Sequence, residues 1–177
     1  MDMLAEGSIQ TGVNVKLRIL WLAAALAAMP ALAEDVPFNG RMLELGAGEE
    51  ARPILRMSGT QYAIQRSGEQ LVEMAGSCLA GQGGVVVESA DPAQGLLLAS
   101  VETGFRASFS AQTLRSRLRF EAGDGRFQIV ESDFSLAQGG DEGSVVYGPL
   151  VQSGSVWEKG LEALVETENR LVDCLYR

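Results

Sequence analysis

The chain has 177 residues, of which 46% are hydrophobic, and its 14 basic and 23 acidic residues give a net charge of −9 at pH 7. It contains no histidine and only two cysteines, which excludes histidine-based triads, imidazole metal sites, four-thiolate clusters and zinc fingers. The acidic balance repels nucleic acid and anionic membrane surfaces. We therefore expect a protein that binds no nucleic acid, holds no metal ion and uses no cofactor.

The N-terminal part of the sequence has the pattern of a secretory leader. Two basic residues precede an apolar run from Ile19 to Met29, which is followed by Pro30 and an Ala-Leu-Ala triplet that ends at Ala33. This pattern is typical of a signal peptide, and the run is shorter than the roughly 20 residues that span a bilayer. The sequence predicts an N-terminal extension and signal peptide over residues 1–33. The mature domain, residues 34–177, is then periplasmic or secreted and has no transmembrane span.

An exported protein with two cysteines is a candidate for one disulfide, here between Cys78 and Cys174. The bridge would close a loop of roughly 100 residues, which the chain-entropy model credits with about 4 to 5 kcal/mol at most. The alternative is two buried thiols that do not meet. We favour the disulfide.

The first half of the mature region predicts two short strands and a helix. Arg41–Leu45 alternates in the manner of a strand, and Pro53–Met57 is a second extended piece. Ser67 and Gln70 form an S-x-x-Q capping box, and the apolar residues after it recur at helical spacing until Gly81. An amphipathic helix is therefore expected from Ser67 to about Gly81.

The second half predicts a meander of strands and a closing helix. The expected strands are Val85–Glu88, Leu96–Val101, Phe105–Ser110, Leu114–Phe120 and Arg126–Val130. In the third of these, Phe109 belongs to the apolar side of the alternation. After a glycine-rich loop, residues 155–175 have the spacing of a second amphipathic helix.

These elements predict an α+β fold, with an antiparallel sheet of about four to six strands and two helices packed on one face. Cys78 lies on the apolar side of the first helix, and Cys174 lies at the edge of the apolar stripe of the second. Helices side by side on one face would bring the sulfurs together and leave the other sheet face to water. We expect such a two-layer sandwich.

The last hairpin contains Asp124-Gly125-Arg126-Phe127, and Asp133-Phe134 follows it. With the order strand, helix, four-strand meander, helix, this region resembles the bacterial family described as domain of unknown function 4468 with a TBP-like fold. The resemblance covers roughly residues 67–175. It implies that fold and export, and it brings no activity and no catalytic residues. The TATA-binding-protein likeness concerns architecture, so it does not imply DNA binding.

The strongest candidate site is a group of arginines on the predicted sheet. Its members are Arg106, Arg115, Arg117, Arg119 and Arg126. Between the first and last of them the only acids are Glu121 and Asp124. A cationic face of this kind is suited to a carboxylate or phosphate polymer, such as an envelope glycan or a lipid headgroup. The alternative is that the arginines are solvated and pair across strands with Glu88, Glu102, Glu121 or Glu131.

Other patterns carry less chemistry. The glycine-rich segment of residues 81–84 precedes a strand, whereas a phosphate loop follows one. The adjacent acids Asp141 and Glu142 are typical of a solvated turn. A serine nucleophile would need Lys159 as its base, and that residue lies on the polar side of its predicted helix. No catalytic residue is therefore assigned.

The sequence thus predicts an exported, non-catalytic binding or accessory module of the cell envelope, with the arginine group as a possible anion site. One alternative is a structural or assembly subunit that docks a protein partner through the open sheet face or an edge strand. A further alternative is a histidine-free hydrolase that uses carboxylates.

Overall fold

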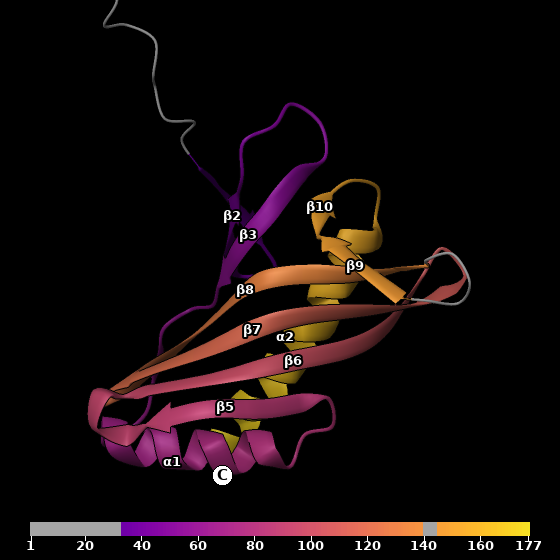
Figure 1. The fold of residues 1–177 in the computed structure, drawn as a ribbon. Helices are drawn as coiled ribbons and strands as arrows, with labels where there is room; N and C mark the ends of the chain where they lie inside the picture. Colours follow the sequence, from indigo (N-terminus) through magenta and orange to yellow (C-terminus); the bar gives the residue numbers. More distant parts are fainter. Residues whose placement is uncertain (1–32, 140–144) are drawn as a thin grey trace, which may run out of the picture. The chain divides into compact units, whose positions relative to one another are not determined.

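Ten strands pair into one antiparallel sheet in the computed structural model, which describes residues 33–139 and 145–177. The main path of the sheet runs β1-β2-β3-β8-β7-β6-β5 (Figure 1). The strands are β1 (Glu34–Phe38), β2 (Arg41–Leu45), β3 (Arg52–Ser58), β4 (Tyr62–Ala63), β5 (Val85–Asp91), β6 (Leu96–Ala107), β7 (Ser110–Gly123), β8 (Arg126–Gly139), β9 (Val145–Pro149) and β10 (Val151–Gln152). The predicted α+β class with an antiparallel sheet is confirmed, and the predicted count of four to six strands was wrong. The predicted leader lies outside the described residues except for Ala33.

The long strands β6, β7 and β8 are the centre of the sheet. Along β7, Leu114, Leu118 and Phe120 are fully buried and alternate with exposed residues. This period of two is what an antiparallel strand with one covered face requires. The alternation predicted for the meander is therefore confirmed in β7.

The prediction for Phe109 was wrong. Residues 96–101 and 105–107 belong to one strand, β6, which ends at Ala107. Ser108 and Phe109 form the turn to β7, with φ of 48° and 66°, and the Phe109 side chain is fully exposed. A two-residue hairpin turn needs positive φ at both central positions and favours Gly or Asn there. Because Ser108 and Phe109 are neither Gly nor Asn, the sequence does not show that β6 ends at Ala107.

The additional strands lie along the other edge of β8. Three segments pair with that edge in turn: β4 at Arg126 and Phe127, β3 at residues 130–132, and β9 at residues 135–139. The short β10 then pairs with β3. Segments of two to five residues are too short for a visible alternation, so the sequence does not predict β4, β9 and β10. The predicted end of the last hairpin strand at Val130 was wrong, because β8 continues to Gly139.

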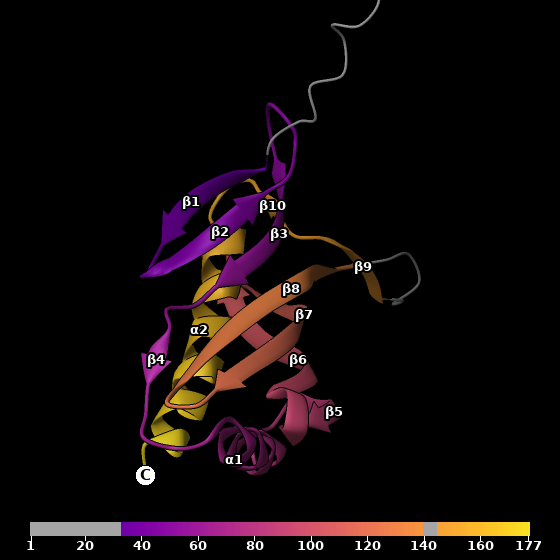
Figure 2. The same cartoon turned by 90° about the vertical axis from the view of Figure 1, so that its left-hand side faces the viewer.

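Two helices contribute to one core with the inward side chains of the sheet. Helix α1 (Gly68–Ala80) begins at the predicted capping box, in which Gln70 N donates to Ser67 Oγ at 3.3 Å and Ser67 N donates to Gln70 Oε1 at 3.2 Å. Helix α2 (Val156–Leu175) crosses the sheet behind β6–β8, and α1 lies along β5 (Figures 1 and 2). Leu79 of α1 and Leu164 and Leu171 of α2 are fully buried in this core. Neither helix is long and apolar enough to cross a membrane, within the described residues.

A disulfide joins the two helices. The sulfurs of Cys78 and Cys174 are 1.97 Å apart, and the Cα atoms are 6.1 Å apart. The bond ties the C-terminal turn of α2 to α1, as the positions of the cysteines in the predicted helices indicated.

Candidate functional site

The central arginines of the predicted group project from the outer face of β7. Arg115, Arg117 and Arg119 alternate with buried residues, and each side chain is just over half exposed. The helices cover only the opposite face, so these three side chains lie on the open side of the sheet. We call this set the outer arginine row.

Each member of the outer arginine row has an acidic neighbour. Arg115 Nε lies 2.6 Å from Glu102 on β6, and Arg119 Nε lies 2.6 Å from Glu121 on β7 itself. The hydrogen bond to Glu102 raises the pKa of Arg115, whose guanidinium also lies 3.8 Å from the ring centroid of Tyr147. Together with Glu88, which lies 3.6 Å from Arg117, three of the four acids named by the pairing alternative are beside the outer arginine row.

Arg117 is held more loosely than its neighbours. Its Nε is 3.6 Å from Glu88 on β5, and its Nη1 is 3.5 Å from Asp133 on β8. The residues that face it across the ladders are Ser100 on β6 and Ser132 on β8. The guanidinium of Arg117 therefore has two long contacts to acids and short side chains opposite it across both ladders.

The outer face is hollowed beside the outer arginine row. A depression of about 420 Å³ is lined by Val86, Ser100, Glu102 and Arg115, among others. Its lining combines small and apolar residues with one acid and one arginine. Such a depression has room for one or two side chains of a partner.

Arg106 and Arg126 do not join the outer arginine row. Arg106 pairs with Ala111 near the β6–β7 turn, and Arg126 pairs with Gly123 at the β7–β8 turn. These two points of β7 are about 40 Å apart at roughly 3.3 Å per residue. The predicted group of five is therefore one central row with a single arginine near each end.

The outer face is balanced in charge. The acids near the five arginines are Glu88, Glu102, Glu121, Asp124 and Asp133. The positive charge that the sequence shows along residues 106–126 is thus offset by acids from β5, β6 and β8. This face presents both signs of charge to a partner.

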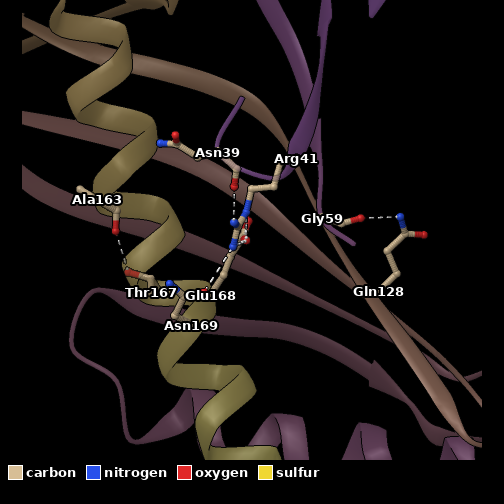
Figure 3. Close-up of polar contacts among 8 residues, drawn as sticks. All are labelled: Asn39, Arg41, Gly59, Gln128, Ala163, Thr167, Glu168 and Asn169. Atoms are coloured by element: carbon tan, nitrogen blue, oxygen red, sulfur yellow. Dashed lines mark hydrogen bonds and ion pairs between the residues drawn. The ribbon is translucent and has the colours of Figure 1, made fainter. Parts of the chain in front are cut away.

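The inner face contains a second set of charged residues, which the sequence analysis missed. Arg41 of β2 lies between β2 and α2, where its Nη2 is 2.6 Å from Glu168 Oε2 and its Nε donates to the same oxygen at 2.7 Å (Figure 3). Its guanidinium also donates to the Asn39 carbonyl at 3.2 Å and to Asn169 Oδ1 at 3.4 Å. The side chains of Arg41 and Glu168 are 9% and 2% exposed. This is a buried ion pair between the sheet and the helix.

Glu131 lies in the same layer and is fully buried. It was one of the acids that the pairing alternative offered to the arginines, and the structure contradicts that pairing because Glu131 points to the other side of the sheet. Its pKa is raised to about 8, mainly by burial and also by the nearby Glu168 carboxylate, while the hydroxyl of Ser116 acts in the opposite direction. Burial also raises the pKa of Glu168, against the effect of Arg41. We call Arg41, Ser116, Glu131 and Glu168 the inner polar cluster.

The inner polar cluster is closed to substrates, because both of its acidic residues are almost entirely buried. A hydrolase that used them would need an opening to solvent. Of the other candidates, Lys159 pairs with Glu162 at 2.7 Å on the surface of α2. Asp141 and Glu142 lie outside the described residues.

The sequence matches no protein-family model and no curated protein. Its fold is similar to that of a TBP-like protein from Parabacteroides distasonis ATCC 8503, with a TM-score of 0.56 at 10% identity over 80% of this chain and 97% of the other. It is also similar to a DUF4468 family protein from Bacteroides ovatus ATCC 8483, with a TM-score of 0.53 at 9% identity over 80% and 90% of the two chains. The predicted resemblance is confirmed at the level of the fold. Neither name states an activity, and likeness at this identity extends to architecture alone.

Proposed function

We propose that the chain is an exported, non-catalytic binding module that meets a protein partner through the outer face of β5–β8. The observation that carries this proposal is the position of Arg117 at the centre of an uncovered, charge-balanced face with only loose contacts to its own acids. A carboxylate of a partner can approach Arg117 more closely than Glu88 and Asp133 do, and it can bind the guanidinium through two parallel hydrogen bonds. Arginine is also among the residues that most often dominate binding energy at interfaces.

The alternation of charge on the face favours a protein over an anionic polymer. A polymer of carboxylates or phosphates would be attracted by the outer arginine row and repelled by Glu88, Glu102 and Asp133. A protein surface with acids and bases in complementary positions satisfies both sets and gains specificity from the pattern. The anionic-polymer hypothesis stays a prediction, and the heparin-column experiment below distinguishes it from the protein-partner proposal.

The sheet edges are less suited to a partner than the face. Edge strand β5 has an irregularity in its pairing between Val87 and Ser89, and Glu88 at that point is charged and exposed. Edge strand β1 contains Pro37, and it begins with two acidic residues. Bulges, prolines and charges at an edge hinder the addition of another strand. Docking by strand addition at these two ends of the main sheet path is therefore disfavoured.

Two features support export and a non-catalytic role. A secretory pattern precedes a domain with a disulfide, and disulfides persist in oxidising compartments. The two acids whose pKa burial raises, Glu131 and Glu168, are sealed inside the core and cannot reach a substrate.

The proposal is tested by site-specific photo-crosslinking of the full-length chain in the bacterium that produces it. A photoreactive residue replaces Ser132 on the outer face, and a matched control carries it at Glu166 on the exposed side of α2. We expect a crosslinked protein of defined mass from position 132 and none from position 166, and we expect Arg117→Glu to abolish the product. Products from position 166 alone would overturn the assignment of the face.

A second measurement separates a protein partner from an anionic polymer. The purified chain is passed over a heparin column at low salt, beside a variant with Arg115→Gln, Arg117→Gln and Arg119→Gln. The proposal predicts that neither chain is retained. Retention of the wild type alone would favour the anionic-polymer hypothesis and overturn the choice of a protein partner.

A further inference from the structure

Glu131 occupies an apolar position of the sheet. Its neighbours across the two ladders are Met57 on β3 and Leu118 on β7, and both are fully buried. Both carboxyl oxygens of Glu131 lack a hydrogen-bond partner among the described residues. A charged carboxylate in such a place loses its hydration without compensation, which disfavours the ionised form strongly.

The groups that act on the Glu131 carboxyl come from two other elements, α2 and β7. Glu168 on α2 is already paired through Oε2 with Arg41 of β2, while its Oε1 is buried and unpartnered. Ser116 on β7 has a buried hydroxyl that is also unpartnered within residues 33–139 and 145–177. The cluster therefore contains one cation, Arg41, and two acids. Glu168 Oε1 can accept a hydrogen bond but has no donor within reach among the described residues.

We propose that Glu131 keeps its proton in the folded protein at neutral pH and that this proton latches helix α2 to the sheet. In the protonated form, the inner polar cluster has one cation, one anion and one neutral acid, so its net charge is zero. The carboxylic O–H supplies the missing donor for Glu168 Oε1 on α2, and the Ser116 hydroxyl on β7 has its own O–H to donate to the other carboxyl oxygen of Glu131. Loss of the proton to solvent hydroxide leaves a second anion beside Glu168, with no second cation, and pushes α2 from the sheet.

The disulfide limits how far the helix can move. Cys174 lies near the C-terminal end of α2 and stays bonded to α1 in either protonation state. Release of the latch therefore loosens the stretch of α2 around Glu168 without freeing the helix. This response is independent of the binding proposed for the outer face, because Glu131 and the outer arginine row point to opposite sides of the sheet.

The latch predicts that the folded state weakens as the pH rises. The folded protein binds one proton that the unfolded chain releases above its ordinary carboxyl pKa. Urea unfolding of the oxidised full-length chain should show an unfolding equilibrium constant that rises by up to tenfold per pH unit between about pH 5 and about pH 8. Glu131→Gln keeps the shape and stays neutral, so its stability should have a clearly smaller slope than that of the wild type, with the remainder coming from Glu168, whose pKa is also raised. Glu166→Gln, an exposed change on the same helix, should retain it.

The decisive results are distinct. Equal slopes in the wild type and in Glu131→Gln would overturn the proposal, and so would a Glu131→Gln protein that is less stable than the wild type at about pH 8. If Glu131→Gln fails to fold, infrared spectroscopy of the wild-type chain labelled with ¹³C-glutamate still tests the proposal without any variant. We expect the stretch of a protonated carboxyl at neutral pH, together with its loss in alkali. Its absence at neutral pH would show that Glu131 is ionised.

Discussion

The two faces of the sheet use the same chemical groups in opposite ways. On the outer face, Arg115 and Glu102 are 2.6 Å apart with side chains that are about half exposed. On the inner face, Arg41 and Glu168 are also 2.6 Å apart, but both side chains are almost entirely buried. The contact distance is equal, and the surrounding medium differs.

Water explains why the two pairs have different consequences. Exposed ion pairs are screened, exchange readily with water and contribute little to stability, so their charges remain available to a partner. Buried charges have lost their hydration, and each depends on its partner to offset that loss. We therefore assign recognition to the outer arginine row and the attachment of α2 to the inner polar cluster.

The largest effect is expected from breaking the inner pair. Arg41→Met removes the only cation that contacts Glu168 among the described residues, and it leaves that carboxyl buried without compensation. We expect a loss of about 3 to 5 kcal/mol in the free energy of unfolding, measured by urea denaturation. A loss below about 1 kcal/mol would show that the pair behaves as an exposed one.

Removal of the disulfide tests the second link that holds α2 to the rest of the fold, and it leaves the outer face of the sheet untouched. The double variant Cys78→Ser and Cys174→Ser frees a link between residues 96 positions apart. We expect it to cost about 2 to 5 kcal/mol in the free energy of unfolding, with the outer face unchanged. Calorimetry under non-reducing conditions measures the difference. Equal stability of the two proteins would indicate that the cysteines are not bonded.

The pH dependence separates the faces in the next measurement. Because the pKa of Glu131 is raised to about 8 in the folded state, its contribution favours folding below the ordinary carboxyl pKa and is lost as the pH rises toward about 8. The expected slope is at most about 1.4 kcal/mol per pH unit. Neutralising acids of the outer face, for example with Glu121→Gln, should leave the slope unchanged. If the slope vanished in Glu121→Gln, the titrating group would lie on the outer face, against the assignment to Glu131 on the inner face.

The smallest effect is expected on the outer face. Arg119→Gln breaks a pair of exposed side chains with Glu121. We expect a change below about 1 kcal/mol in the free energy of unfolding, which falls further as salt is added. A loss comparable to that of Arg41→Met would remove the distinction between the faces.

The sequence contains enough information for the class of fold but not for the full sheet. Long periodic segments such as α1, α2 and β7 were predicted because their apolar spacing repeats over many residues. The short strands β4 and β9 pair with the long edge of β8, and β10 pairs with β3, and these partners are visible only after folding. The exposed Phe109 was assigned to the wrong side for a related reason, since its turn lacks the usual glycine or asparagine.

The candidate sites were predicted unevenly. The outer arginine row follows from alternation, but its acidic partners on β5, β6 and β8 depend on the register between strands. The inner polar cluster is marked in the sequence by acids at positions that the apolar periodicity assigns to the core. Glu131 continues the inward pattern of Phe127 and Ile129, and Glu168 falls on the apolar stripe between Leu164 and Leu171. An acid at a position that periodicity assigns to the core is the signal to look for.

The most direct test of the central claim uses one variant and two readouts. Arg117→Gln is compared with the wild type for photo-crosslinking from position 132 and for its midpoint of urea unfolding. The account predicts that the crosslinked product is lost while the midpoint stays unchanged, because an exposed arginine recognises a partner without supporting the fold. Full crosslinking together with a lowered midpoint would contradict it, since Arg117 would then serve the fold and not recognition.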